Sequence, residues 1–469
     1  MTVHESTPAP SLPVEIHEGI ATVAVTGDRE SAHLVRDSLR GTILRVAIPA
    51  VASSLLMTLF SSVDAFWVGT KIGPSGLAAV STALFWIWMI ISLAEMIGVG
   101  LTAVAARRFG EGRSHEAAHI AGDALVLSVV LGLIVAIVGR LEISKLFAVM
   151  HTPADVTSLG STYLATFLIG TPLVYGFFAV DAAFRASGDT RTPFALLLTS
   201  VAITLVLDPV LILGLGPFPR LGIEGAAIAT IGTRGAAFVM GVSIAARRGL
   251  IRFGRLSSES IRSVCRVGLP TAVTGVTFSL IYIFLTRTTT RFGTPALAAL
   301  GIGHRVESWL FMIGVGFGAA TAAIVGQNLG AGETDRAARA GWLATGYCTV
   351  LGVLACLLEL VFPRQFASLF TSDPAVINEA VKYLRIASFS QLAVCAEIVL
   401  EGALGGAGET VPPMLTSTAL TASRIPFASW AAGKWGSSGI WAVISLTAIG
   451  RGLAMIALWR KGGWKRRVV

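Results

Sequence analysis

Carboxylates inside apolar stretches are the residues of this 469-residue sequence best suited to chemistry. Asp208 precedes Pro209 in one apolar run, Asp64 lies in another, and Asp181 lies four residues before Arg185. A charged carboxylate at bilayer depth is costly unless it is paired, hydrated or protonated, so such residues are rare and usually functional. Burial favours their neutral form, which lets them bind and release protons, and the same oxygens could hold Na⁺.

Each acid also has a structural interpretation. Asp208 could cap a helix break near the outer surface, although the bend expected at Pro209 would also free backbone carbonyls for an ion. Asp64 could be a rim residue, and Asp181 could form an intrahelical ion pair with Arg185. For Glu95 we expect only a packing role.

The second half of the chain carries a different set of polar residues within its apolar runs. His304, Arg305 and Glu307 are clustered, and Glu397 and Glu401 are one helical turn apart. A pairing between Arg305 and a glutamate would satisfy both charges. We therefore predict a structural polar network here, to which Arg424 could also belong.

Membrane-spanning helices must position these residues. The chain is 54% apolar and only 13% charged, and its mean hydropathy is +0.75, which is far from the composition of soluble domains. Apolar runs of about 20 residues, long enough to cross a bilayer, recur along it. They predict twelve transmembrane helices, at residues 42–69, 76–105, 117–139, 160–184, 193–214, 223–246, 266–290, 295–326, 338–362, 382–405, 412–432 and 438–460.

An internal repeat relates the two halves. The segment that begins Gly188-Asp189-Thr190 returns as Gly408-Glu409-Thr410, 220 positions later. The Phe109–Gly112 segment returns as Leu329–Gly332 at the same separation, and Arg45–Pro49 returns as Arg266–Pro270 at 221. Matches spread over this length indicate duplication. Because each copy has six spans, the copies enter the membrane in the same direction, and a site is expected where they face each other.

The predicted organisation therefore has two lobes. It comprises a polar cytoplasmic tail (1–41), an N-lobe (42–246), a basic cytoplasmic linker (247–265), a C-lobe (266–460) and a basic cytoplasmic tail (461–469). Segments on the side of the N-terminus carry 22 Lys/Arg, and the opposite loops carry 10. The more basic side is expected to be cytoplasmic. Both termini are then inside, in the cell (plasma or inner) membrane.

Several function classes lack support. The net charge is +9, but the basic residues lie in short loops between apolar runs and not along one face, so we expect no nucleic-acid partner. We predict no metal other than Na⁺ at Asp64 and Asp208, and no cofactor beyond the coupling ion. Phosphate-loop, zinc-hydrolase and nucleophile-elbow motifs are absent from the sequence, so an enzyme is not expected. A passive channel would transport without ion exchange.

Ordered motifs resemble those of the multidrug and toxic compound extrusion (MATE) transporters over residues 42 to 460. They are Val63-Asp64-x-x-Trp67-Val68-Gly69, Ala106–Gly112, Phe184–Pro193, Leu207-Asp208-Pro209, Gly225–Thr230, Arg305-x-Glu307 and Gly326–Gly332. The aspartates of spans 1 and 5 resemble the DNA-damage-inducible protein F-like branch. That branch often carries Asn one turn before the span-5 aspartate, where this chain has Thr204.

The resemblance implies a central cavity between two six-helix lobes and export of cationic or amphipathic organic compounds, driven by H⁺ or Na⁺. It assigns coupling-ion binding to Asp64, Asp208, Thr230 and Asp181, with Thr204 beside them. Because threonine offers one oxygen and a short reach, we favour protons. We expect a monomer that exchanges the ion for a small cationic solute. The alternative is a flippase for a lipid-linked intermediate, which would line its cavity with arginines to bind phosphate.

Overall fold

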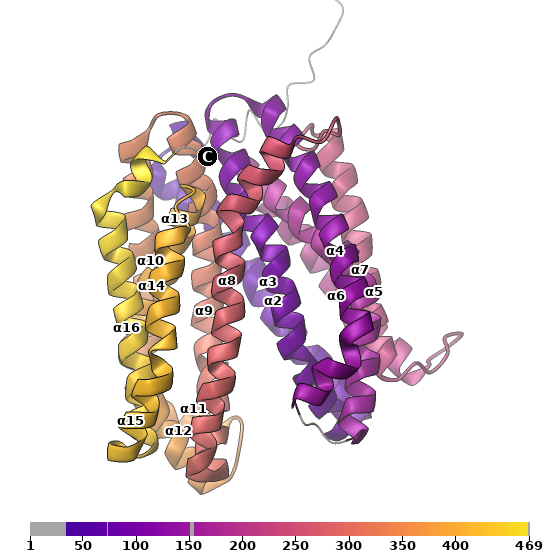
Figure 1. The fold of residues 1–469 in the computed structure, drawn as a ribbon, viewed down its shortest axis with the longest axis vertical. Coiled ribbons are helices and arrows are strands. Elements are labelled where there is room, and N and C mark those ends of the chain that lie inside the picture. Colours follow the sequence, from indigo (N-terminus) through magenta and orange to yellow (C-terminus); the bar gives the residue numbers. More distant parts are fainter. Residues whose placement is uncertain (1–33, 73, 151–153, 468–469) are drawn as a thin grey trace, which may run out of the picture.

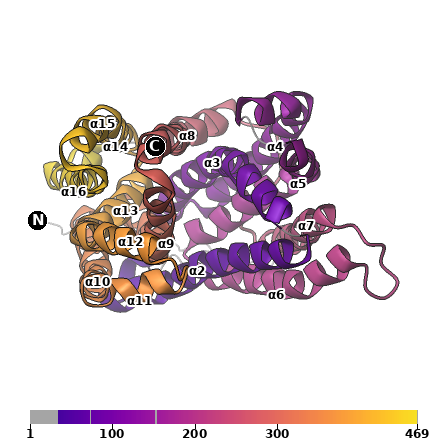
Figure 2. The ribbon, with the colours of Figure 1, turned by 90° about the horizontal axis from the view of Figure 1, so that it is seen from below.

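The protein is all-helical in the computed structural model, which describes residues 34–72, 74–150 and 154–467. Six long helices form one lobe and the remaining helices form the other (Figure 1, Figure 2). The N-lobe helices are α2 (Leu39–Lys71), α3 (Pro74–Gly110), α4 (Ser114–Met150), α5 (Ala154–Ser187), α6 (Arg191–Leu213) and α7 (Ile223–Arg247).

The C-lobe contains shorter and broken helices as well as long ones. Its elements are α8 (Ser258–Thr289), η1 (Thr290–Phe292), α9 (Gly293–Gly330), α10 (Thr334–Val361), α11 (Pro363–Ser368), α12 (Pro374–Ala387), η2 (Ser388–Ser390), α13 (Gln391–Gly406), α14 (Val411–Ala422), α15 (Arg424–Trp435), α16 (Ser437–Lys461) and η3 (Gly463–Arg466).

Eleven helices of the described chain are long and apolar enough to cross a membrane. The twelfth predicted span, 412–432, is divided into α14 and α15 at Ser423. Pro426 explains the division, since it has no amide hydrogen to donate to the carbonyl of Ala422, the last residue of α14. Together α14 and α15 supply the remaining crossing, which gives the two-lobe, twelve-span architecture.

Several boundaries differ from the sequence-based expectation, and the largest difference is at the end of α4, which reaches Met150 and not residue 139. Helix α8 begins at Ser258 and not at residue 266, so only residues 248–257 of the linker are non-helical. The predicted span 382–405 is α12 and α13 joined by the 3₁₀ turn η2, and the short helix α11 precedes it. The first 33 residues of the polar tail lie outside the described chain.

The repeat is visible in the turns that end corresponding helices. Gly112 and Gly332, 220 positions apart, both have positive φ (73° and 79°). Each follows a helix that ends with the same type of hydrogen bond. Arg113 N–H donates to the Arg108 carbonyl (2.8 Å), and Glu333 N–H donates to the Asn328 carbonyl (2.8 Å). Gly188 and Gly408 repeat the pattern with φ of 100° and 79°. Glycine adopts this left-handed conformation without the strain that a Cβ imposes.

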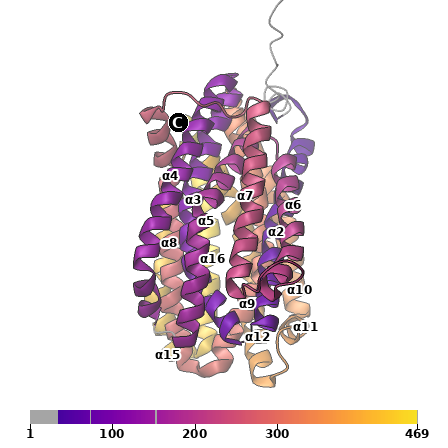
Figure 3. The same ribbon diagram turned by 90° about the vertical axis from the view of Figure 1, so that its right-hand side faces the viewer.

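The lobes contact each other closely at the end that carries residue 467. A Cβ on Gly110 (α3) would lie 1.9 Å from the carbonyl oxygen of Gln327 (α9), so only glycine permits this approach. Gln327 Nε2 donates to the Ala186 carbonyl of α5 (2.6 Å), and Arg107 Nη1 donates to the Arg467 carbonyl (2.6 Å). The lobes diverge toward the opposite end (Figure 1). In the view turned by 90° about the vertical axis, helices of the N-lobe lie in front of the C-lobe (Figure 3).

Candidate functional site

The register between α6 and α7 determines which N-lobe side chains meet. The hydroxyl oxygens of Thr204 and Thr233 are 2.7 Å apart. Two turns farther along α6, the backbone of Leu211 lies so close to Gly225 that a Cβ there would be 2.8 Å away. The helices are therefore antiparallel with Thr204 opposite Thr233 and Leu211 opposite Gly225. Asp208, between these contacts, is level with the turn of α7 that contains Thr230.

Asp208 and Thr230 are both removed from the surface, with exposed fractions of 0% and 7%. The Thr230 hydroxyl has no hydrogen-bond partner among the described residues. Helix α6 continues through Pro209, which leaves the Leu205 carbonyl without its usual helical donor. A buried carboxylate, a hydroxyl and a backbone carbonyl thus lie at the same level of α6 and α7. The carboxylate can accept a proton, and all three oxygens can bind a small cation.

Asp64 lies on α2, but its side chain is outside the described residues. The helix turn before it contacts α7, since Arg234 Nη2 is 3.1 Å from the sulfur of Met57 and its guanidinium lies 5.7 Å from the ring centre of Phe60. Because Asp64 follows Phe60 by one turn and Thr230 precedes Arg234 by one turn, this part of α2 runs beside the Asp208 site.

Arg234 is the notable addition to the N-lobe acids. Its side chain is buried (8% exposed) on the same face of α7 as Thr230. In the sequence it could be identified only as an arginine within a span. A fixed positive charge at this depth favours ionised carboxylates nearby and opposes the binding of a metal cation.

Asp181 is placed differently from Asp208. It forms an ion pair with Arg185 one turn later on α5, and the two side chains are 19% and 25% exposed. This confirms the intrahelical pairing that the four-residue spacing indicates. The Arg185 guanidinium compensates its charge, so Asp181 is less suited than Asp208 to bind an ion. Glu95, on α3, is exposed in the protein and therefore lacks the packing role expected for it.

The C-lobe contains an extensive ionic network. Arg451 Nη1 on α16 lies 2.9 Å from Glu397 Oε1 on α13, and the side chains are 13% and 7% exposed. Arg424, at the start of α15, is 1% exposed. Its Nε donates to the Thr447 hydroxyl (2.7 Å) and its Nη1 to the Tyr282 hydroxyl (3.3 Å).

Glu307 extends this network on α9. It accepts a hydrogen bond from the Tyr383 hydroxyl (2.9 Å), and His304 Nδ1 is 3.9 Å from the same carboxylate. The predicted pairing of Arg305 with a glutamate is wrong for the described residues, because Arg305 is exposed and other groups bind Glu307 and Glu397. Glu401, one turn after Glu397, is half-buried.

A further buried pair was not anticipated from the sequence. Glu359, near the end of α10, is 3% exposed, and both of its oxygens accept from Gln391 Nε2 at 2.9 and 3.0 Å. Its position in an apolar run could have indicated it, as for the N-lobe aspartates. The described residues contain no cluster of three or more His, Cys, Asp or Glu side chains that could hold a metal.

Comparisons with known proteins agree with this architecture. The sequence profile of the MatE family matches residues 49–210 and again 270–430, so its two matches begin 221 and end 220 positions apart. The probable multidrug resistance protein YoeA of Bacillus subtilis is 27% identical over 390 residues, which are 81% of this chain and 84% of YoeA. A FAD transporter of Shewanella oneidensis is 28% identical over 349 residues, which are 73% of this chain and 77% of that protein.

Solved structures also resemble the fold. The crystal structure of a variant of the Vibrio cholerae MATE transporter VcmN superimposes with a TM-score of 0.85 at 23% identity. The alignment covers 94% of this chain and all of that one.

Proposed function

This chain belongs to the MatE family, and we propose that it exports cationic or amphipathic organic compounds in exchange for protons. Members of this family are transporters and not enzymes, and the chain is an integral membrane protein. The observation that carries the proposal is the buried Asp208, level with Thr230 and beside the part of α2 that contains Asp64. A carboxylate in this position can be protonated from one side of the membrane and deprotonated toward the other.

The small number of oxygen ligands at the site favours protons over Na⁺ as the coupling ion. The Thr204 hydroxyl is already shared between the Ser200 carbonyl (2.8 Å) and Thr233, which leaves few free oxygens around Asp208. Na⁺ needs several oxygen ligands at once, whereas a proton needs one.

The arrangement of the lobes suits alternating access. They meet closely at the end carrying residue 467 and diverge at the other (Figure 1). The excess of Lys/Arg on the side of the termini supports an orientation with both termini in the cytoplasm. In that orientation the lobes diverge toward the outside, which corresponds to a state ready to release cargo and accept a proton.

A phosphate-bearing substrate is the second candidate, including the lipid-linked intermediate of a flippase. The relative named as a FAD transporter supports it, because FAD carries a pyrophosphate. Two arginines of the C-lobe spans argue against it: Arg451 is paired with Glu397, and Arg424 is buried among donors and acceptors of its own lobe. Retention of a pyrophosphate lipid by the purified protein would favour this candidate.

The proposal is tested by dye efflux from proteoliposomes, driven in turn by an imposed pH gradient and an imposed Na⁺ gradient. We expect the pH gradient to drive efflux of a lipophilic cation, and both Asp64→Asn and Asp208→Asn to abolish it. Glu224→Gln, which alters an exposed carboxylate at the start of α7, is the matched control and should be fully active. Full activity of both aspartate variants would overturn the proposal.

A further inference from the structure

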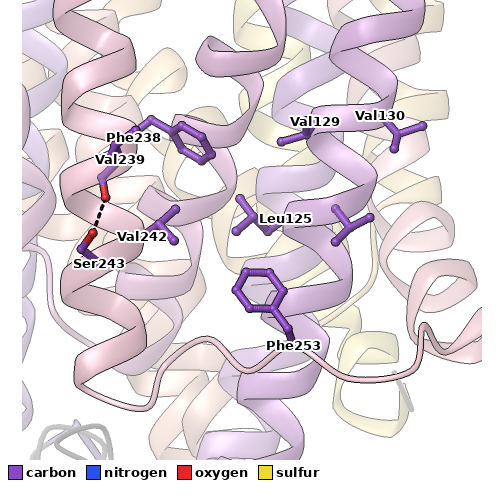
Figure 4. Close-up of a pocket in the computed structure, with 9 residues that line it drawn as sticks. Leu125, Val129, Val130, Phe238, Val239, Val242, Ser243 and Phe253 are labelled. Atoms are coloured by element: carbon purple, nitrogen blue, oxygen red, sulfur yellow. Dashed lines mark hydrogen bonds between the residues drawn. The ribbon is translucent and has the colours of Figure 1, made fainter.

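An apolar groove runs along the outside of the N-lobe between α4 and α7 (Figure 4). Its volume is about 410 Å³. Val130 and Val239 on its two walls are 48% and 61% exposed, so the groove opens outward, away from the protein interior. The residues that line it are Leu125, Val126, Val129, Val130, Phe238, Val239, Val242, Ser243 and Phe253.

The groove exists because α4 and α7 pack on α5 and not on each other. Gly132 brings α4 close to α5, since a Cβ there would be 2.7 Å from the Cα of Pro172. On the other side, the Phe238 ring of α7 lies over Gly176 of α5, where a Cβ would be 2.5 Å from it. The space left between the two outer helices is lined by apolar side chains at membrane depth.

The interlobe linker closes one end of this groove and is fixed in place. Arg252 N–H donates to the Ala118 carbonyl of α4 (2.9 Å), and the Ser257 N–H donates to Asp123 Oδ2 (3.3 Å). Gly122 permits the approach, because a Cβ there would be 2.1 Å from the Arg252 carbonyl oxygen. Phe253, which is 61% exposed, points from the linker toward the groove (Figure 4).

Basic side chains surround this end of the groove. Residues 247–262 contain five arginines and one acid, Glu259. Arg248 is paired with Asp189, whereas Arg247, Arg252 and Arg255 are exposed and form no ion pair with any residue that the structure describes. The exposed apolar residues Phe253 and Leu256 alternate with them. Apolar and basic residues combined in this way are typical of segments at the membrane interface.

The depth of the groove matches this charge distribution. The linker contacts α4 from Ala118 to Asp123, and the groove runs from Leu125 to Val130, which lies about 18 Å farther into the membrane than Ala118 at 1.5 Å per helical residue. Arginines therefore lie at the level of lipid headgroups, and the apolar groove lies at the level of acyl chains.

We propose that this surface is a binding site for an anionic glycerophospholipid. One acyl chain occupies the α4–α7 groove against Phe238 and Phe253, and Arg252 and Arg255, with Arg247, bind the phosphate. Guanidinium groups recognise phosphate through paired charge-assisted hydrogen bonds. The site is independent of the transported substrate, and it connects the lipid to the segment that joins the two lobes.

Native mass spectrometry of the full chain tests this proposal with phosphatidylglycerol and phosphatidylcholine of identical acyl chains. We expect the wild type to retain phosphatidylglycerol at least tenfold more strongly than phosphatidylcholine, since each arginine near a membrane surface adds to the attraction for an anionic lipid. Arg252→Gln/Arg255→Gln should remove this preference. Arg339→Gln/Arg466→Gln, which removes two exposed charges from the same end of the molecule, should keep it.

A groove-filling variant separates the acyl-chain site from the charges. Val242→Trp should lower retention of both lipids, whereas Val350→Trp, on the exposed face of α10, should not. The arginine variants and Val350→Trp alter exposed side chains, whereas Val242 is partly buried in the wall of the groove. Elution and thermal unfolding in lipid-free detergent that match the wild type show that each variant is folded. Equal retention of the two lipids by the wild type would overturn the proposal. So would an undiminished phosphatidylglycerol preference in Arg252→Gln/Arg255→Gln, or unchanged retention of both lipids by Val242→Trp.

Discussion

The hydroxyl oxygens of Thr204 on α6 and Thr233 on α7 lie 2.7 Å apart in the buried interior of the N-lobe. Each hydroxyl is also within hydrogen-bond distance of a carbonyl of its own helix. Thr204 is close to the carbonyl of Ser200, and Thr233 is close to that of Ala229. This pair sets the register that brings Asp208 level with Thr230. The ion site that we propose therefore depends on a contact between two neutral residues one turn away from the acid.

Replacing Thr204 with Val should weaken this register. The variant has nearly the same volume but leaves Thr233 with only its own-helix acceptors, so we expect a loss of about 1 kcal/mol in the free energy of unfolding. Thermal unfolding in detergent measures it. Thr199→Val removes a hydroxyl that bonds only to Ala195 on the exposed face of the same helix. Equal effects of the two substitutions would show that the Thr204–Thr233 contact has no special role.

The interlobe contact at Gly110 makes a second prediction. A Cβ there would be 1.9 Å from the Gln327 carbonyl oxygen, so Gly110→Ala should push α3 from α9 and separate the lobes at the end carrying residue 467. Spin labels placed on the two lobes at that end should report a longer distance. Gly346→Ala is the control, since nothing described lies within 4 Å of its Cβ. It should instead stabilise α10 by roughly 0.5–1 kcal/mol. An unchanged label distance in Gly110→Ala would contradict this account of lobe closure.

The Arg451–Glu397 pair of the C-lobe makes a third prediction. Removing one partner leaves a buried charge, so Arg451→Met alone should destabilise the protein by about 3–5 kcal/mol. Combining it with Glu397→Leu should restore most of the loss, because the carboxylate that Arg451→Met leaves unpaired is then removed as well. A double-mutant cycle of thermal stability measures the coupling. If the double variant also transports, the pair is structural; additive losses of stability would show that the two residues do not interact.

Glu111 provides a pH-dependent prediction outside the spans. Partial burial opposes its ionisation, but the hydrogen bonds and charges of Arg108 (2.6 Å) and Arg113 (3.1 Å) outweigh burial and lower its pKa from 4.5. A lowered folded-state pKa gives stability that is complete above the unfolded value and is lost as the pH falls through the folded one. Glu111→Gln should therefore lower the free energy of unfolding at pH 6–7. The difference in this free energy between the variant and the wild type should shrink below about pH 4.5.

The control for Glu111 is Glu224→Gln, which removes an exposed carboxylate that forms no ion pair with a described residue and should leave the free energy of unfolding unchanged. If the difference in free energy of unfolding between Glu111→Gln and the wild type persisted unchanged below the folded-state pKa, the stabilisation by Glu111 would not be ionic.

The sequence predicted the fold well because its signals are local. The length of the apolar runs predicted the membrane spans. The glycines of the repeat, such as Gly112 and Gly332, mark turns with the same backbone conformation. The break at Ser423 was missed, although Pro426 is a local signal for it. Which arginine pairs with which glutamate was not predictable, because Arg451 and Glu397 meet only after distant helices pack. The same is true of Arg234, whose neighbours come from α2.

The most direct test of the central claim counts the ions that purified protein releases when a lipophilic cation is added in weakly buffered solution. Because coupling between two ligands is reciprocal, exchange at Asp208 requires the cation to displace protons. We predict proton release from the wild type and from Glu224→Gln, no Na⁺ release, and no proton release from Asp208→Asn. Undiminished proton release from Asp208→Asn with the cation still bound would contradict the account.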